Sequence, residues 1–149
     1  MRIFKIKTPK SSSIQLYDEN EKLIGEILTN LILGLREKIK INDKIFKIKN
    51  NGFIGIDIKV FDENETLIIE SDTSKNRLIY FGDLKEIYSY QNEKWFGNKV
   101  NLFTDEKLVM SIKVLGTFKT DYEIKVAKDF NNNVVILTFL NFYNRLNGA

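Results

Sequence analysis

The sequence predicts a mainly β fold: a closed β-barrel of about twelve strands around a buried, hydrophobic C-terminal helix. Three observations lead to this prediction. Apolar and polar residues alternate in short runs before residue 130, which is typical of half-buried strands separated by polar turns. A strand–turn–strand segment recurs three times, and residues 134–146 are almost continuously apolar. The length of 149 residues suits one domain, covering residues 1–149.

The first hairpin is expected near the N-terminus. Its strands follow an initial strand at residues 3–7, which we expect to end at Pro9 and the serines after it. The next strand surrounds Leu16, and the acidic residues 18–21 predict a tight turn. The apolar run at 23–33 then returns along the preceding strand.

Residues 36–49 predict the clearest hairpin of the chain. Asn42 and Asp43 lie at its centre, and both residue types tolerate the left-handed backbone of a two-residue turn. About a dozen strands at spacings near ten residues are typical of a closed barrel or a sandwich. The later strands are expected at 53–61, 67–70, 77–81, 86–90, 94–96, 100–103, 108–114 and 122–126.

An internal repeat links three of these hairpins. Segments 14–27, 58–71 and 100–113 each contain alternating apolar residues, an aromatic residue, an acidic turn and a leucine that opens the return strand. A quasi-repetitive β fold explains this recurrence, and chance similarity among ordinary hairpins is the alternative. The aromatic residues are Tyr17, Phe61 and Phe103, which lie 44 and 42 residues apart.

The last segment predicts a helix from about residue 132 to 146. An asparagine among residues 131–133 supplies the N-cap, and the apolar residues that follow leave no broad polar face. The β-branched start keeps a strand as the alternative. A helix that is apolar on all sides must be surrounded, and at about 20 Å it is shorter than the roughly 30 Å hydrocarbon core of a bilayer. A barrel wide enough to enclose the helix would cover it.

These features together resemble the tubby C-terminal-like superfamily, which includes plant LURP-one-related proteins and phospholipid scramblases. The matching features are the aromatic and Asp-Glu-Asn hairpins at 17–20 and 61–64, the segment at 121–130 and the hydrophobic run at 134–146. The resemblance extends over essentially the whole chain. It implies a twelve-stranded barrel wound around a hydrophobic helix.

The composition restricts the possible chemistry. The chain has no Cys and no His, which excludes disulfides and thiolate chemistry and removes the commonest general base. It has neither a GxxxxGK[ST] loop nor a GxGxxG fingerprint to bind phosphates. The acidic turns at 18–21 and 62–65 offer carboxylates for Ca²⁺ or for acid–base catalysis, but solvated turns explain them better. We therefore expect no enzyme activity, no cofactor and no metal.

The charge and the N-terminus indicate the class of partner and the compartment. The net charge of +3 is mild for a protein that coats nucleic acid, so nucleic acid is disfavoured as a partner. The first residues alternate charged and apolar side chains and do not form a signal peptide. We expect a cytoplasmic protein without a transmembrane segment.

The hairpin at 36–49 is the best candidate site. If its strands pair in register, its basic side chains form a positive stripe suited to lipid headgroups or to a nucleic-acid backbone, although Glu37 and Asp43 reduce the charge. A plain solvated strand face, where lysine discourages aggregation, is the alternative interpretation. The candidate residues for an anionic ligand are Arg36, Lys38, Lys40, Lys47 and Lys49.

Three classes of function remain open on the sequence alone. The first is a non-enzymatic binding or scaffold module whose partner is an anionic membrane surface or another protein. The second is a small-ligand carrier that resembles lipocalins, with a hollow barrel and the helix packed outside. The third is an enzyme that acts through carboxylates or lysine, which requires a deep pocket with convergent acidic residues. The first class explains best the absence of a catalytic constellation.

Overall fold

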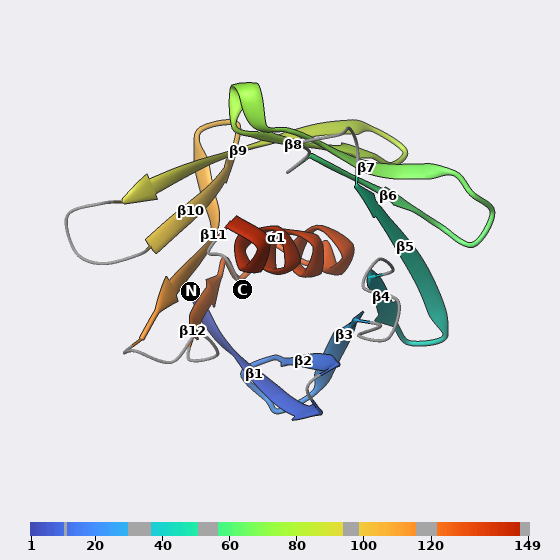
Figure 1. Cartoon of the computed structure of the whole chain (residues 1–149). Coiled ribbons are helices and arrows are strands. Elements are labelled where there is room, and N and C mark those ends of the chain that lie inside the picture. The colour runs from blue at the N-terminus through green and yellow to red at the C-terminus, as the bar shows by residue number, and fades with distance from the viewer. Residues whose placement is uncertain (11, 30–36, 51–56, 94–98, 116–121, 147–149) are drawn as a thin grey trace.

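The computed structural model describes residues 1–10, 12–29, 37–50, 57–93, 99–115 and 122–146. These residues form twelve strands, one short 3-10 helix and one α-helix (Figure 1). The strands are β1 (Arg2–Lys10), β2 (Ser13–Tyr17), β3 (Leu23–Thr29), β4 (Glu37–Ile41), β5 (Lys44–Asn50), β6 (Ile58–Phe61), β7 (Leu67–Asp72), β8 (Arg77–Phe81), β9 (Lys85–Glu93), β10 (Lys99–Thr104), β11 (Lys107–Val114) and β12 (Tyr122–Val126). The helices are η1 (Thr73–Lys75) and α1 (Asn133–Leu146).

The strands form one closed antiparallel barrel. Each strand pairs with its neighbours in the chain, and β1 pairs with β12 to close the ring. The closing pair places Arg2 opposite Val126 and Phe4 opposite Ile124. The predicted mainly β fold and twelve-strand barrel are confirmed, and the sandwich alternative is wrong.

Helix α1 lies in the middle of the ring of strands (Figure 1). Every residue from Val134 to Tyr143 is at most 9% exposed, so the barrel covers the helix on all sides. The ring of Tyr90 on β9 packs 5.3 Å from the ring of Phe142. On the opposite side Gly25 of β3 allows close approach, because a Cβ there would lie 2.5 Å from Leu137 Cδ1. The helix is therefore the centre of the hydrophobic core.

The segment between β12 and α1 is fixed by hydrogen bonds at both of its ends. Arg2 Nη2 donates to the carbonyl oxygens of Ala127 at 3.0 Å and Phe130 at 2.5 Å. Asn132 is the N-cap, since its Oδ1 accepts a hydrogen bond from the amide of Val135 at 3.3 Å. The expected asparagine cap is confirmed, and α1 begins one residue after the expected start.

The internal repeat has a structural counterpart. The three repeated segments form the hairpins β2–β3, β6–β7 and β10–β11, which lie four strands apart around the barrel. In each hairpin the pairing register shifts directly before the turn, at the residue that the repeat aligns. The aligned residues are Tyr17, Phe61 and Phe103, and the extra residue of each bulge lies on the return strand, at Ile24, Ile68 and Val109.

The acidic turns of the first two repeats share the same hydrogen bonds. Asp18 Oδ1 accepts the amides of Asn20 and Lys22, at 2.8 and 3.0 Å. Asp62 Oδ1 accepts the amides of Asn64 and Thr66 in the same way, both at 2.9 Å. The two aspartates therefore stabilise their own turns.

The first strand differs from its prediction. β1 does not end before Pro9 but continues through it to Lys10. The pairing of β1 with β2 shifts between Lys7 and Lys10, so Pro9 lies at an irregularity where the regular ladder is interrupted. The expected strand at 94–96 lies outside the described residues, as do the last part of the run at 23–33 and the first part of the strand at 53–61.

Candidate functional site

The basic hairpin predicted at 36–49 is formed by β4 and β5. Asn42 has φ of 53° and supplies the left-handed position of the turn. Ile39 and Ile48 point into the barrel, at 0% and 3% exposure, so their neighbours along each strand point outward. In the observed register Lys38 lies directly opposite Lys47.

The next strand extends this surface with a residue that the sequence analysis did not select. Lys59 on β6 lies directly opposite Lys49 on β5, and it flanks the fully buried Val60. The alternation of β6 was visible in the sequence, but its pairing with β5 was needed to place Lys59 beside the hairpin. We name this outward surface the lysine face: Lys38, Lys40, Lys47, Lys49 and Lys59.

The lysine face carries positive charge that no ion pair neutralises within the described part of the chain. Glu26 lies opposite Lys40, and Glu70 lies opposite Lys59, yet no N–O distance of 4.0 Å or less joins either pair. Lys49 Nζ lies 5.1 Å from the centre of the Phe61 ring. Like charges directly opposite each other destabilise a sheet, so this face is stabilised when an anion lies on it.

Two further residues of the predicted hairpin are Arg36 and Glu37. Arg36 lies outside the described residues. Glu37 was expected to reduce the charge of the stripe, and this expectation is wrong. The side chain of Glu37 lies on the same inner face of β4 as that of Ile39. Its Oε2 accepts a hydrogen bond from Asn141 Nδ2 at 2.6 Å. Its carboxylate therefore contacts the helix inside the barrel.

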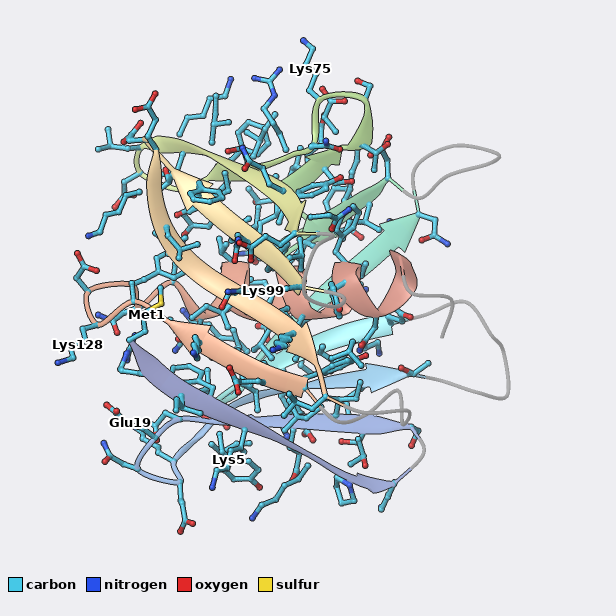
Figure 2. The ribbon with its side chains drawn as sticks, turned by 90° about the vertical axis from the view of Figure 1, so that its left-hand side faces the viewer. Met1, Lys5, Glu19, Lys75, Lys99 and Lys128 are labelled. Carbon is cyan, nitrogen blue, oxygen red and sulfur yellow. The ribbon has the colours of Figure 1, made fainter. Side chains whose placement is uncertain are left out.

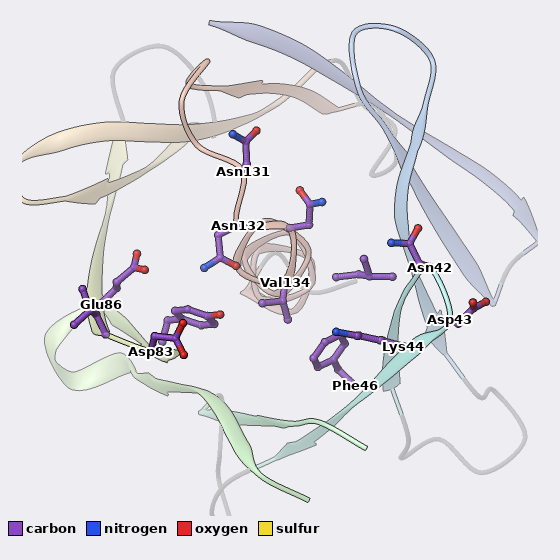
Figure 3. A pocket seen from close by; sticks show the side chains of 13 residues that line it. Asn42, Asp43, Lys44, Phe46, Asp83, Glu86, Asn131, Asn132 and Val134 are labelled. Carbon is purple, nitrogen blue, oxygen red and sulfur yellow. The ribbon is translucent and has the colours of Figure 1, made fainter. Parts of the chain in front are cut away.

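A second candidate site lies at the end of the barrel where α1 begins. Here the β4–β5 and β8–β9 turns and the residues before the helix surround a cavity of about 740 Å³, which we name the mouth pocket (Figure 3). An adjoining cavity of about 320 Å³ extends toward the β6–β7 turn. The two cavities share Lys44, Phe46, Tyr80 and Val134.

Charged groups occupy different walls of the mouth pocket. Lys44 and Asp43 lie on one wall, and Asp83 and Glu86 lie on the other (Figure 3). The Asp43 carboxylate points away from the centre of the pocket, whereas the Lys44 side chain points across it. Glu86 is already engaged, because the hydroxyl of Tyr88 donates a hydrogen bond to its Oε2. Burial, reinforced by this contact with Glu86, raises the pKa of Tyr88 above its usual value. Tyr88 is therefore a protonated donor at neutral pH.

The adjoining cavity adds carboxylates that the backbone already uses. Asp62 stabilises its own turn, and Glu63 Oε1 accepts the amide of Ile45 at 3.0 Å. Across the ranges that the structure covers, no group of three acidic side chains is arranged to hold a metal ion. In the same ranges no helix has the length and apolar character needed to cross a bilayer.

The interior of the barrel bears on the carrier alternative. The carrier alternative assumed a hollow barrel with the helix packed on its outside. In the structure α1 occupies the centre of the ring and is buried along its length. The mouth pocket is the larger of the two cavities described above, and it opens at the end of the barrel. A small ligand would therefore bind above the helix and not around it.

The comparisons with known proteins do not add a relative. No family model matches the chain, and neither a curated protein nor a solved structure matches it. The resemblance to the tubby C-terminal-like superfamily therefore stays a prediction.

Proposed function

We propose that this chain is a non-enzymatic binding module whose lysine face contacts anionic lipid headgroups at a membrane surface. The observation that carries the proposal is the pairing of Lys38 with Lys47 and of Lys49 with Lys59, each directly opposite across neighbouring strands. Two such pairs concentrate positive charge on one outer surface of a rigid barrel. An anionic surface of this kind faces the cytoplasm, the compartment that the sequence predicts.

The size of the charge suits a reversible interaction. Each lysine near an anionic bilayer contributes about 1 kcal/mol, so the five residues of the lysine face together favour binding by several kcal/mol. Lys40, Lys47 and Lys49 are exposed, and their side chains can reach headgroups without a change in the barrel. Because the interaction is electrostatic, binding should weaken as salt is added.

Co-sedimentation with vesicles tests the proposal. The protein should sediment with vesicles of phosphatidylcholine and phosphatidylserine, and not with vesicles of phosphatidylcholine alone. Changing Lys38, Lys40, Lys47 and Lys49 to Glu should abolish this binding. All four side chains point away from the core, so the barrel should still fold, which circular dichroism can establish.

A matched variant controls for the overall charge. Changing Lys5, Lys22, Lys75 and Lys128 to Glu alters the net charge by the same amount at exposed positions elsewhere, three of which appear in Figure 2. This variant should retain most of the binding. Equal loss in the two variants would show that net charge alone attracts the protein, and unchanged binding after reversal of the lysine face would refute the lipid site. If the protein binds nucleic acid and not the anionic vesicles, the partner is a different one and the proposal is contradicted.

A further inference from the structure

The mouth pocket is separate from the lysine face. Its lining comes from the turns at one end of the barrel and from Val134 on the first turn of α1, whereas the lysine face lies on the outside of the wall. A volume of about 740 Å³ falls within the range of pockets that bind small molecules. The pocket therefore has room for a ligand that the buried helix excludes from the interior.

One side of the pocket offers an unpaired cation. The side chain of Lys44 lies on the same face of β5 as those of Phe46 and Ile48. It therefore points toward the inside of the barrel, at its rim. Figure 3 shows its amino group directed over the pocket. No ion pair or hydrogen bond to Lys44 Nζ is present among the residues that the structure places.

The facing wall offers an unpaired anion. Asp83, in the turn between β8 and β9, lies across the pocket from Lys44 (Figure 3). The two groups do not form an ion pair, and within the described ranges Asp83 has no other charged partner. Glu86 adds negative charge to the same wall, although its Oε2 already accepts the hydroxyl of Tyr88.

Apolar side chains connect the two walls. Phe46, Tyr80 and Val134 line both cavities, and Figure 3 shows Val134 between Lys44 and Asp83. A ligand with only a negative charge would be repelled by Asp83 and Glu86, and a ligand with only a positive charge would be repelled by Lys44. A molecule with one charge of each sign avoids both conflicts, and its apolar middle can lie on the aromatic side chains.

We propose that the mouth pocket binds a small zwitterion, with its carboxylate at Lys44, its ammonium group at Asp83, and an apolar segment packed on Phe46, Tyr80 and Val134. Binding involves no covalent step and no metal. The pocket thus serves as a second, independent site of the module. Its occupation does not require the lysine face.

Nuclear magnetic resonance titration with linear ω-amino acids, from 4-aminobutanoate to 8-aminooctanoate, tests this proposal. The series varies the separation of the two charges, and at least one member should shift the signals of Val134 and Tyr80 in a saturable manner. Hexanoate and hexylamine each lack one charge. Both should bind about tenfold more weakly than the best ω-amino acid of the series.

Two single variants assign the charges. Lys44→Met should remove the preference for the zwitterion over hexylamine, and Asp83→Asn should remove its preference over hexanoate. Lys47→Met and Asp105→Asn are the matched controls, on the outer face of β5 and in another turn, and both should bind as the wild type does. The proposal is overturned if no member of the series causes a saturable shift, or if the singly charged compounds bind as tightly. Because no lipid is present, a failure here leaves the vesicle result unaffected.

Discussion

At the scale of single residues, Arg2 holds the entry of the helix in place. Its guanidinium group donates to two carbonyl oxygens in the segment between β12 and α1 and lies 5.2 Å from the centre of the Phe4 ring. The same residue pairs with Val126 where the barrel closes. The Arg2 side chain therefore links the first strand to the segment that leads from β12 to α1.

We expect Arg2→Met to lower the free energy of unfolding by about 2 kcal/mol, because two carbonyl oxygens lose a charged donor. Urea unfolding followed by circular dichroism measures this change. Lys5→Met, at an exposed position of the same strand, is the control and should change stability by no more than about 0.5 kcal/mol. Equal midpoints for the two variants would contradict this role of Arg2.

The two candidate sites differ in how far single residues could be predicted. Alternation around Ile39 and Ile48 predicted that Lys38 and Lys47 share one face, and the observed register agrees. The same alternation places Lys44 and Glu37 on the inner side, so a signal for both was present in the sequence. It was missed because a charged side chain was assumed to point outward.

At the scale of elements, α1 could be predicted more closely than β1. Its apolar sequence, its asparagine cap and its length were sufficient to predict its bounds to within one residue. The continuation of β1 through Pro9 could not be predicted in this way. It depends on a shift in the pairing with β2, and local sequence does not specify where such a shift occurs.

Leu140→Asp should prevent cooperative folding, since Leu140 is 0% exposed and the carboxylate would have no partner in the apolar core. The expected result is insoluble protein, or soluble protein without a sigmoidal thermal transition. Leu84→Asp is the matched control, because Leu84 is 79% exposed in the β8–β9 turn and should tolerate the same substitution. A Leu140→Asp variant that unfolds cooperatively would refute the role of α1 as the core.

At the scale of the whole molecule, buried tyrosines make the barrel sensitive to alkaline pH. Burial raises the pKa of Tyr90 and of Tyr122 to about 12. Nearby Asp57 and Asp72 add to the effect at Tyr90, and Tyr143 adds to it at Tyr122. In the unfolded chain these phenols ionise near pH 10.

Stability should therefore be complete below about pH 10 and should fall as the pH rises toward 12, because the unfolded chain loses protons that the folded barrel retains. Each such tyrosine contributes a slope of up to about 1.4 kcal/mol per pH unit in this window. Urea unfolding at several alkaline pH values gives the slope, and absorbance of tyrosinate follows ionisation. Tyr122→Phe should reduce this slope by the contribution of one tyrosine. Ionisation of all tyrosines near pH 10 without loss of stability would contradict this prediction.

The closed barrel itself was only partly predictable. Strand number, hairpin turns and the internal repeat are local features, and the sequence contained them. Closure depends on the pairing of β1 with β12, residues more than a hundred positions apart, and a sandwich has the same local pattern. The mouth pocket also depends on closure, because separate turns such as 42–43 and 82–84 meet around α1 only in the complete ring.

Synthesis on the ribosome produces all the described strands before α1, since the helix follows β12 in the chain. Until α1 emerges, wall residues such as Ile39, Val60 and Leu102 have no helix to cover them. A nascent chain with this much uncovered apolar surface is prone to aggregation and is a substrate for chaperones. Folding can therefore be completed only after α1 has been synthesised. The barrel closes around the helix once all its described strands have been translated, and not one strand at a time.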